Sequence, residues 1–111
     1  MKKLIAAVVL CATTMAHGSY LDGNKLYGYL MSSSDLENTH AWGYIAGISD
    51  AYNGGSHCIP AGVSVGQLRD IVKNFLASTP EVRHRPADLI VYAVLKNTYP
   101  CAEKKKGKGG A

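Results

Sequence analysis

The sequence predicts an all-α domain of four helices that is closed by one disulfide bond. Apolar residues recur at three- and four-residue spacing in four separate segments, which is typical of amphipathic helices. The β-branched clusters show no alternation with polar residues, so they do not indicate strands. Cys58 and Cys101 flank the last two helical segments. A single core in a chain this small is only marginally stable, so a cross-link is expected.

The first two helices are expected over residues 24–32 and from residue 35 to about residue 52. Ser34 is a candidate N-cap for the second helix, with Glu37 placed to complete a capping box. Asn53 and the two glycines after it end this helix. Its apolar stripe consists of Ala41, Tyr44, Ile45, Ile48 and Tyr52.

The third helix has the clearest pattern. Ser64 is its expected N-cap, Gln67 returns the capping bond, and Thr79 with Pro80 stops it. Its apolar stripe consists of Val65, Leu68, Ile71, Val72, Phe75 and Leu76. The fourth helix is expected to begin with Pro86 in its first turn and to end before Pro100. Its apolar residues are Leu89, Ile90, Ala93 and Val94.

Residues 1–16 have the pattern of an export signal. Lys2 and Lys3 precede an apolar run, and a small-x-small cleavage site ends at Ala16. The run is too short to span a bilayer, which needs about 20 apolar residues. Cys11 would be a lipidation site only if a small residue preceded it, and Leu10 stands there. We therefore expect a periplasmic product that is membrane-attached only if Cys11 is lipidated.

The charge of the chain is concentrated at its ends. Residues 17–102, the expected domain, hold six Lys and Arg and seven Asp and Glu, a net charge of −1. Nucleic-acid binding is not expected, because it needs basic residues clustered on a folded face. Residues 103–111 are rich in lysine and glycine and are predicted to be disordered. An alternative role for this tail is attraction to an acidic partner or to anionic lipid.

The two cysteines outside the signal are expected to form a disulfide bond. Export places them in an oxidising compartment, where paired cysteines are normally bridged. Cys58 precedes the third helix and Cys101 follows the fourth, so the bridge would join neighbouring ends of an antiparallel hairpin. The alternative is a nucleophile and base pair of Cys58 with His84, which requires a free thiolate. The second cysteine and the export signal favour the bridge.

No other constellation indicates catalysis or a cofactor. The histidines at positions 17, 40, 57 and 84 have no metal-ligand spacing, and no nucleophile or phosphate-binding motif is present. We therefore expect no metal, no cofactor and no enzymatic activity.

Three groups of residues are candidates for contacts. Gly43 and Gly47, four apart on the second helix, indicate close packing against another helix, or else a surface that a partner approaches closely. Arg83 and Arg85 are either solvated charges or contacts for an acidic partner. The polar loop before Cys58 is either a simple connection or a segment that enters a concave target. Its residues are Gly54, Gly55, Ser56 and His57.

The order of several short motifs resembles the Rap/Tai immunity proteins over about residues 24–101. The motifs are Gly43-Tyr44-Ile45-Ala46-Gly47-Ile48-Ser49-Asp50, Cys58-Ile59-Pro60-Ala61-Gly62-Val63-Ser64, Gln67-Leu68, Pro80-Glu81-Val82-Arg83-His84 and Tyr99-Pro100-Cys101. The motifs are individually weak, and their order and spacing make the set specific. The family consists of small, exported, helical periplasmic proteins that neutralise peptidoglycan amidase toxins delivered by type VI secretion.

The resemblance implies a periplasmic inhibitor that occludes a peptidoglycan amidase or a related cell-wall hydrolase, and it implies a homodimer. Family members usually carry two further cysteines, where this chain reads Leu30-Met31-Ser32 and His40-Ala41-Trp42. One family disulfide is therefore absent. The alternative function is a small helical acid-stress chaperone of the periplasm, which would use its histidines and carboxylates as a pH switch.

Overall fold

The computed structural model describes residues 19–102, which form four α-helices and one short 3-10 helix. The α-helices are α1 (Gly23–Met31), α2 (Asp35–Tyr52), α3 (Val65–Ser78) and α4 (Ala87–Thr98). The short helix η1 (Pro80–Val82) was not predicted. The all-α prediction is confirmed for this part of the chain. The predicted export signal, Cys11 and the lysine-rich tail lie outside the described residues.

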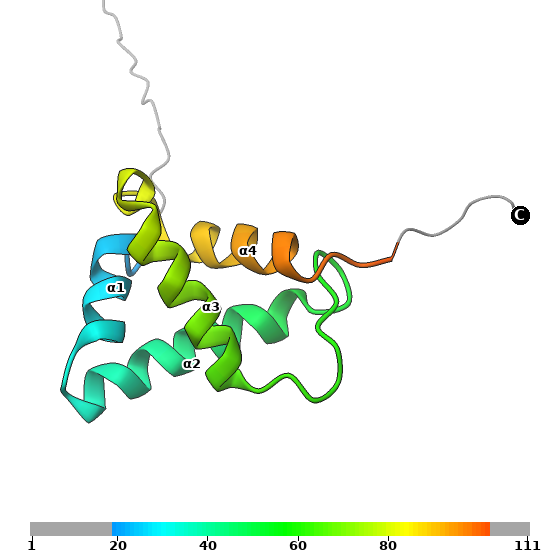
Figure 1. Cartoon of the computed structure of the whole chain (residues 1–111), viewed down its shortest axis with the longest axis horizontal. Helices are drawn as coiled ribbons and strands as arrows, with labels where there is room; N and C mark the ends of the chain where they lie inside the picture. The colour runs from blue at the N-terminus through cyan, green and yellow to red at the C-terminus, as the bar shows by residue number, and fades with distance from the viewer. Residues whose placement is uncertain (1–18, 103–111) are drawn as a thin grey trace, which may run out of the picture.

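Each of the four α-helices packs against the other three, and α2 and α3 make the most extensive contacts (Figure 1). Helices α2 and α4 both end on the side of the molecule where the long loop of residues 53–64 leads into α3 (Figure 1). Helix η1 and residues 83–86 connect α3 to α4 at the opposite side, next to the start of α1 (Figure 1). None of the described helices has the length and apolarity of a membrane span.

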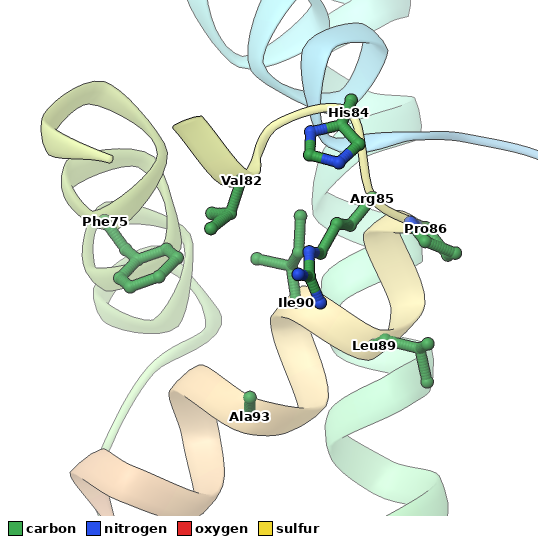
Figure 2. Close-up of a pocket in the computed structure, with 8 residues that line it drawn as sticks. All are labelled: Phe75, Val82, His84, Arg85, Pro86, Leu89, Ile90 and Ala93. Atoms are coloured by element: carbon green, nitrogen blue, oxygen red, sulfur yellow. The ribbon is translucent and has the colours of Figure 1, made fainter. Parts of the chain in front are cut away.

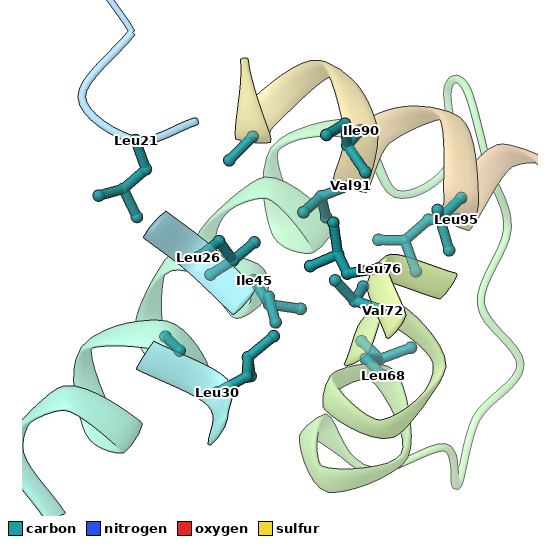
Figure 3. Packing of buried hydrophobic residues seen from close by; sticks show 13 residues of the cluster. Leu21, Leu26, Leu30, Ile45, Leu68, Val72, Leu76, Ile90, Val91 and Leu95 are labelled. Atoms are coloured by element: carbon teal, nitrogen blue, oxygen red, sulfur yellow. The ribbon is translucent and has the colours of Figure 1, made fainter. Parts of the chain in front are cut away.

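The core is one cluster of aliphatic side chains drawn from all four α-helices (Figure 3). Leu26, Ile45, Val72, Leu76 and Leu95 are completely buried in it. The predicted stripes of the second and third helices supply its centre, as the helical spacing requires. In α4 the stripe is wider than predicted and includes Val91, whereas Leu89 remains 60% exposed.

The caps explain where most helices begin. The Ser64 side chain accepts from the Gln67 amide and Gln67 Oε1 accepts from the Ser64 amide, so the predicted capping box of α3 is confirmed. Ser34 caps α2 by accepting from the Glu37 amide, but the structure records no return bond from the Glu37 side chain. Asp22 caps α1 by accepting from the Lys25 amide.

Pro86 occupies the N-cap position of α4, one residue before the predicted first-turn position. Proline suits either place, because it has no amide hydrogen to satisfy and its fixed φ favours the helix that follows.

The junction of α1 and α2 is held without a covalent bond. Asn38 Nδ2 donates to the carbonyls of Tyr29 and Ser32, at 2.8 and 3.0 Å, and so caps the end of α1. The rings of Tyr29 and His40 pack at a centroid distance of 5.1 Å. These contacts link the two regions in which the resembled family usually has its second pair of cysteines. Amide and aromatic contacts therefore tie α1 to α2 in this chain.

The predicted disulfide bond between Cys58 and Cys101 is present, with the two Cα atoms 4.8 Å apart. The Cys58 amide also donates to the Tyr99 carbonyl at 2.8 Å, directly beside the bridge. The loop after α2 is thereby fastened to the end of α4.

Candidate functional site

The loop after α2 contains a compact exposed turn, residues 53–58, which we call the Gly54 turn. The Gly54 amide donates to the His57 carbonyl at 2.7 Å, while the Gly55 and Ser56 amides both donate to the Tyr52 carbonyl. Gly54 has φ +92°, a conformation that other residues rarely adopt. The backbone of the turn therefore satisfies its own hydrogen bonds and depends on a glycine at position 54.

His57 anchors this turn and is not available for a partner contact. Its side chain is completely buried, and Nε2 lies 3.1 Å from the Ser49 carbonyl oxygen in α2. The prediction that His57 belongs to the exposed contact surface is wrong. A polar histidine in a loop looks accessible in sequence, but here the ring fills space beneath the turn.

Three further contacts hold the ends of the Gly54 turn. Asn53 Oδ1 accepts from the Ile59 amide at 2.9 Å, and the Cys58 amide donates to Tyr99. The disulfide bond adds a covalent link to Cys101. Gly54 and Gly55 remain exposed and Ser56 is partly exposed. The turn is therefore a fixed, exposed tip with little side-chain bulk.

The second predicted contact region divides into two arginines with different environments. The Arg83 guanidinium lies over the Tyr27 ring at 4.4 Å, and its buried Nε has no hydrogen-bond partner among the described residues. The Arg83 carbonyl accepts from the Asn24 amide at 2.7 Å. Arg83 thus fastens the start of α1 through its carbonyl and is only partly exposed, and its contact with a partner stays a prediction. Arg85, in contrast, is exposed and lies at the rim of a cavity.

That cavity, which we call the α3–α4 groove, has a volume of about 490 Å³ (Figure 2). Helix η1 supplies Val82, and Arg85 and His84 lie at the end where the chain enters α4 (Figure 2). The remaining lining residues are apolar and come from α3 and the first turns of α4: Phe75, Pro86, Leu89, Ile90 and Ala93. The sequence had assigned Phe75, Leu89, Ile90 and Ala93 to the core stripes. Their spacing identifies a helix face, but it cannot tell how fully that face is covered.

The two glycines predicted to pack closely do not do so within the described chain. A Cβ atom added at Gly43 or Gly47 would meet no atom within 4 Å, and both residues are exposed. The packing prediction is therefore wrong for the single chain. Both glycines instead leave smooth, open positions on the surface of α2.

The described residues offer no basis for a thiol enzyme. Cys58 is in the disulfide bond, so the alternative pairing with His84 as a nucleophile and base is wrong. Within residues 19–102 no three His, Cys, Asp or Glu side chains lie together in a way that could hold a metal ion. The Gly54 turn and the α3–α4 groove are both suited to contact with another molecule.

One protein family matches the chain over most of its length. The family model of the Rap1a immunity proteins matches residues 8–101 of the chain. A comparison with curated protein sequences gave no match. The match covers most of the chain and includes all four α-helices and both bridged cysteines. The chain belongs to the Rap1a immunity protein family, a family of non-enzymatic proteins that bind a cognate toxin.

Proposed function

We propose that this protein protects cells in the periplasm by binding a peptidoglycan-cleaving amidase toxin and blocking its active-site cleft. Family membership supports the binding of a toxin. The Cys58–Cys101 bridge supports action in an oxidising compartment, because disulfide bonds form and persist there. The inhibitor contributes shape and contacts to the complex and takes no part in chemistry.

The observation that carries this proposal is the fixed geometry of the Gly54 turn. An inserted loop loses conformational entropy when it binds, and a loop that is already ordered loses less. Here the tip is held by its own backbone hydrogen bonds, by the buried His57 ring and by the disulfide bond. Glycines at the tip let another protein's backbone approach closely. These are the properties of an inhibitory loop that enters a cleft.

Inhibition is tested with purified secreted peptidoglycan amidases, beginning with any encoded next to this gene. Clearing of a cell-wall suspension is measured with increasing amounts of the protein, and lysozyme serves as the control hydrolase. We expect one amidase to be inhibited at near-equimolar protein and lysozyme to be unaffected. If no amidase is slowed while client proteins are kept soluble at low pH, the acid-stress chaperone is the correct function.

The role of the turn is tested by Gly55→Trp, which adds bulk at the tip. A Cβ atom added at the exposed Gly55 meets only the Tyr52 carbonyl oxygen, at an ordinary contact distance of 3.5 Å, so the backbone there accepts a side chain. We expect at least tenfold weaker inhibition. Gly28→Trp is the matched control, because Gly28 is exposed on α1 and a Cβ atom added there would meet no atom within 4 Å. Equal inhibition by both variants would assign the contact to another surface.

Two further parts of the proposal have separate tests. Fractionation of cells that express the full chain is expected to place it in the periplasm, with a mass that corresponds to cleavage after Ala16. Sedimentation velocity at micromolar concentration is expected to show a homodimer, as the resemblance implies. A strictly monomeric protein would remove the dimer without affecting the inhibitor function.

A further inference from the structure

The α3–α4 groove continues along α4 beyond its first cavity. A second cavity of about 240 Å³ is lined by Phe75, Ala93, Val94, Asn97 and Thr98. It shares Phe75 and Ala93 with the first cavity, so the two cavities are adjacent along the same pair of helices, and we call them together the channel. The channel follows α4 from its start nearly to its end. At 1.5 Å per residue this corresponds to about 18 Å, or roughly three turns of a partner helix.

The two ends of the channel differ in charge. His84 and Arg85 border one end, and the uncharged Asn97 and Thr98 border the other. Arg85 makes no ion pair with any of residues 19–102. The floor between the ends is apolar, with Leu89 60% exposed and Phe75 and Ile90 beside it. An occupant that matches this surface carries apolar side chains along one face and a carboxylate at the Arg85 end.

The charged end of the channel is rigid. The Arg85 carbonyl accepts from the Gly23 amide at 2.9 Å and the Arg83 carbonyl accepts from the Asn24 amide at 2.7 Å. These bonds satisfy amides that the start of a helix otherwise leaves without a partner. Two residues after Arg85, the Ala87 amide donates to the Leu21 carbonyl at 2.9 Å. The backbone that presents Arg85 is therefore tied to α1 before any partner arrives.

We infer that the α3–α4 groove docks an amphipathic helical segment of the toxin, with an acidic side chain of that segment placed against Arg85. Binding of an amphipathic helix in an apolar groove is a common mode of protein recognition. The helix contacts the groove through apolar residues spaced three and four apart. The inference rests on the proposed function for the identity of the partner. It assigns a second contact surface that is distinct from the Gly54 turn.

Other occupants fit the groove less well. The lysine-rich tail of this chain has no large apolar side chain, and it has the same sign of charge as Arg85. A small-molecule site normally combines an apolar pocket with several polar groups placed to orient the ligand. Here the polar side chains are few: His84 and Arg85 come from the chain that enters α4, with Arg85 reaching toward Ile90 (Figure 2), and Asn97 and Thr98 come from the last turn of α4. A protein segment uses the whole length of such a surface.

The inference is tested without the toxin by selecting from a phage library of 16-residue helical peptides on the purified protein. We expect the enriched peptides to share apolar residues at three- and four-residue spacing and an Asp or Glu near one end. Backbone amide shifts in NMR spectra are expected to change at Phe75, Arg85, Leu89 and Ala93. Enriched peptides that lack acidic residues, or shifts that map elsewhere, would overturn the inference.

Two substitutions with matched controls examine charge and shape separately. Arg85→Glu reverses the rim charge, and Lys96→Glu makes the same change at an exposed site on α4 outside the groove. Ala93→Trp fills the channel between the two cavities, and Ala77→Trp adds the same bulk at an exposed site on α3. Peptide binding is expected to weaken at least tenfold with Arg85→Glu and Ala93→Trp and to stay within twofold with both controls. Equal effects of variants and controls would overturn the inference.

The same four variants separate this inference from the proposed function. If an amidase is inhibited and the groove variants inhibit it as well as the controls do, the groove is not a toxin contact and the inhibitor function stands. If no amidase is inhibited, the proposed function fails, and peptide binding alone then decides whether the groove docks an acidic amphipathic segment.

Discussion

The Nε2 atom of His57 lies 3.1 Å from the carbonyl oxygen of Ser49, and both residues are buried. A carbonyl only accepts hydrogen bonds, so Nε2 is the donor and carries a proton. The ring thus joins the loop after α2 to the helix that precedes it. This contact positions the Gly54 turn together with the Asn53–Ile59 hydrogen bond and the disulfide bond.

We predict that His57→Ala destabilises the protein by about 2–4 kcal/mol, because it removes a completely buried side chain and its hydrogen bond. The free energy of unfolding is measured by urea denaturation. His84→Ala is the control, since His84 is exposed, and it is expected to leave stability within about 0.5 kcal/mol of the parent. A small effect of His57→Ala would mean that the turn is held by its other bonds alone.

Loss of the disulfide bond is expected to lower the stability of the protein. The bridge joins residues 43 apart in sequence, and the chain-entropy relation gives about 4 kcal/mol for a loop of that length. The double variant Cys58→Ser with Cys101→Ser is compared with the parent in urea, with and without reductant. Reductant should shift the parent's midpoint toward that of the variant and leave the variant unchanged. A midpoint of the parent that does not respond to reductant would contradict the prediction.

Glycines in α1 and α2 are expected to respond to alanine in opposite directions. A Cβ atom at Gly23 would lie 2.7 Å from the Arg83 carbonyl oxygen, so Gly23→Ala should destabilise the protein by about 1–3 kcal/mol. At Gly28, Gly43 and Gly47 the added atom meets nothing, and each alanine should stabilise by up to about 1 kcal/mol through helix propensity. Thermal and urea unfolding of the four variants checks the signs.

The same glycine variants also report on self-association. If Gly43 and Gly47 lie in a homodimer contact, alanine at these positions will weaken the dimer in sedimentation while it stabilises the isolated chain. A dimer that is unaffected by both substitutions must use another surface.

Substitution of Arg83 is expected to lower the stability of the protein more than substitution of Arg85. Arg83→Ala removes the stacking on Tyr27 and the packing of the side-chain stem, and we expect a loss of about 1–2 kcal/mol. Arg85→Ala should change stability by less than about 0.5 kcal/mol, because Arg85 is exposed and makes no ion pair within the described residues. Equal losses in urea would show that both arginines have structural roles.

The helices themselves follow from local sequence. Ser34, Ser64 and Pro86 mark the starts of three helices in the sequence, and the apolar spacing of α2 and α3 predicts which faces form the core. The pairing of Cys58 with Cys101 also follows, because only two cysteines lie outside the predicted signal. These features depend on backbone capping, helix period and cysteine number, and each is visible within a short stretch of chain.

Whether a side chain is covered was decided by the tertiary structure. Leu89 has the spacing of a core residue and stays exposed beside the groove, whereas the polar His57 is buried beneath its own turn. Arg83 stacks on Tyr27 from a distant part of the sequence, and Gly43 and Gly47 face open space. Helical periodicity identifies which residues share a face, but burial depends on what the other helices place against that face. For this reason the sequence alone predicted contact residues in the loop before Cys58 and next to α4, and it could not divide them between structural anchors and exposed side chains.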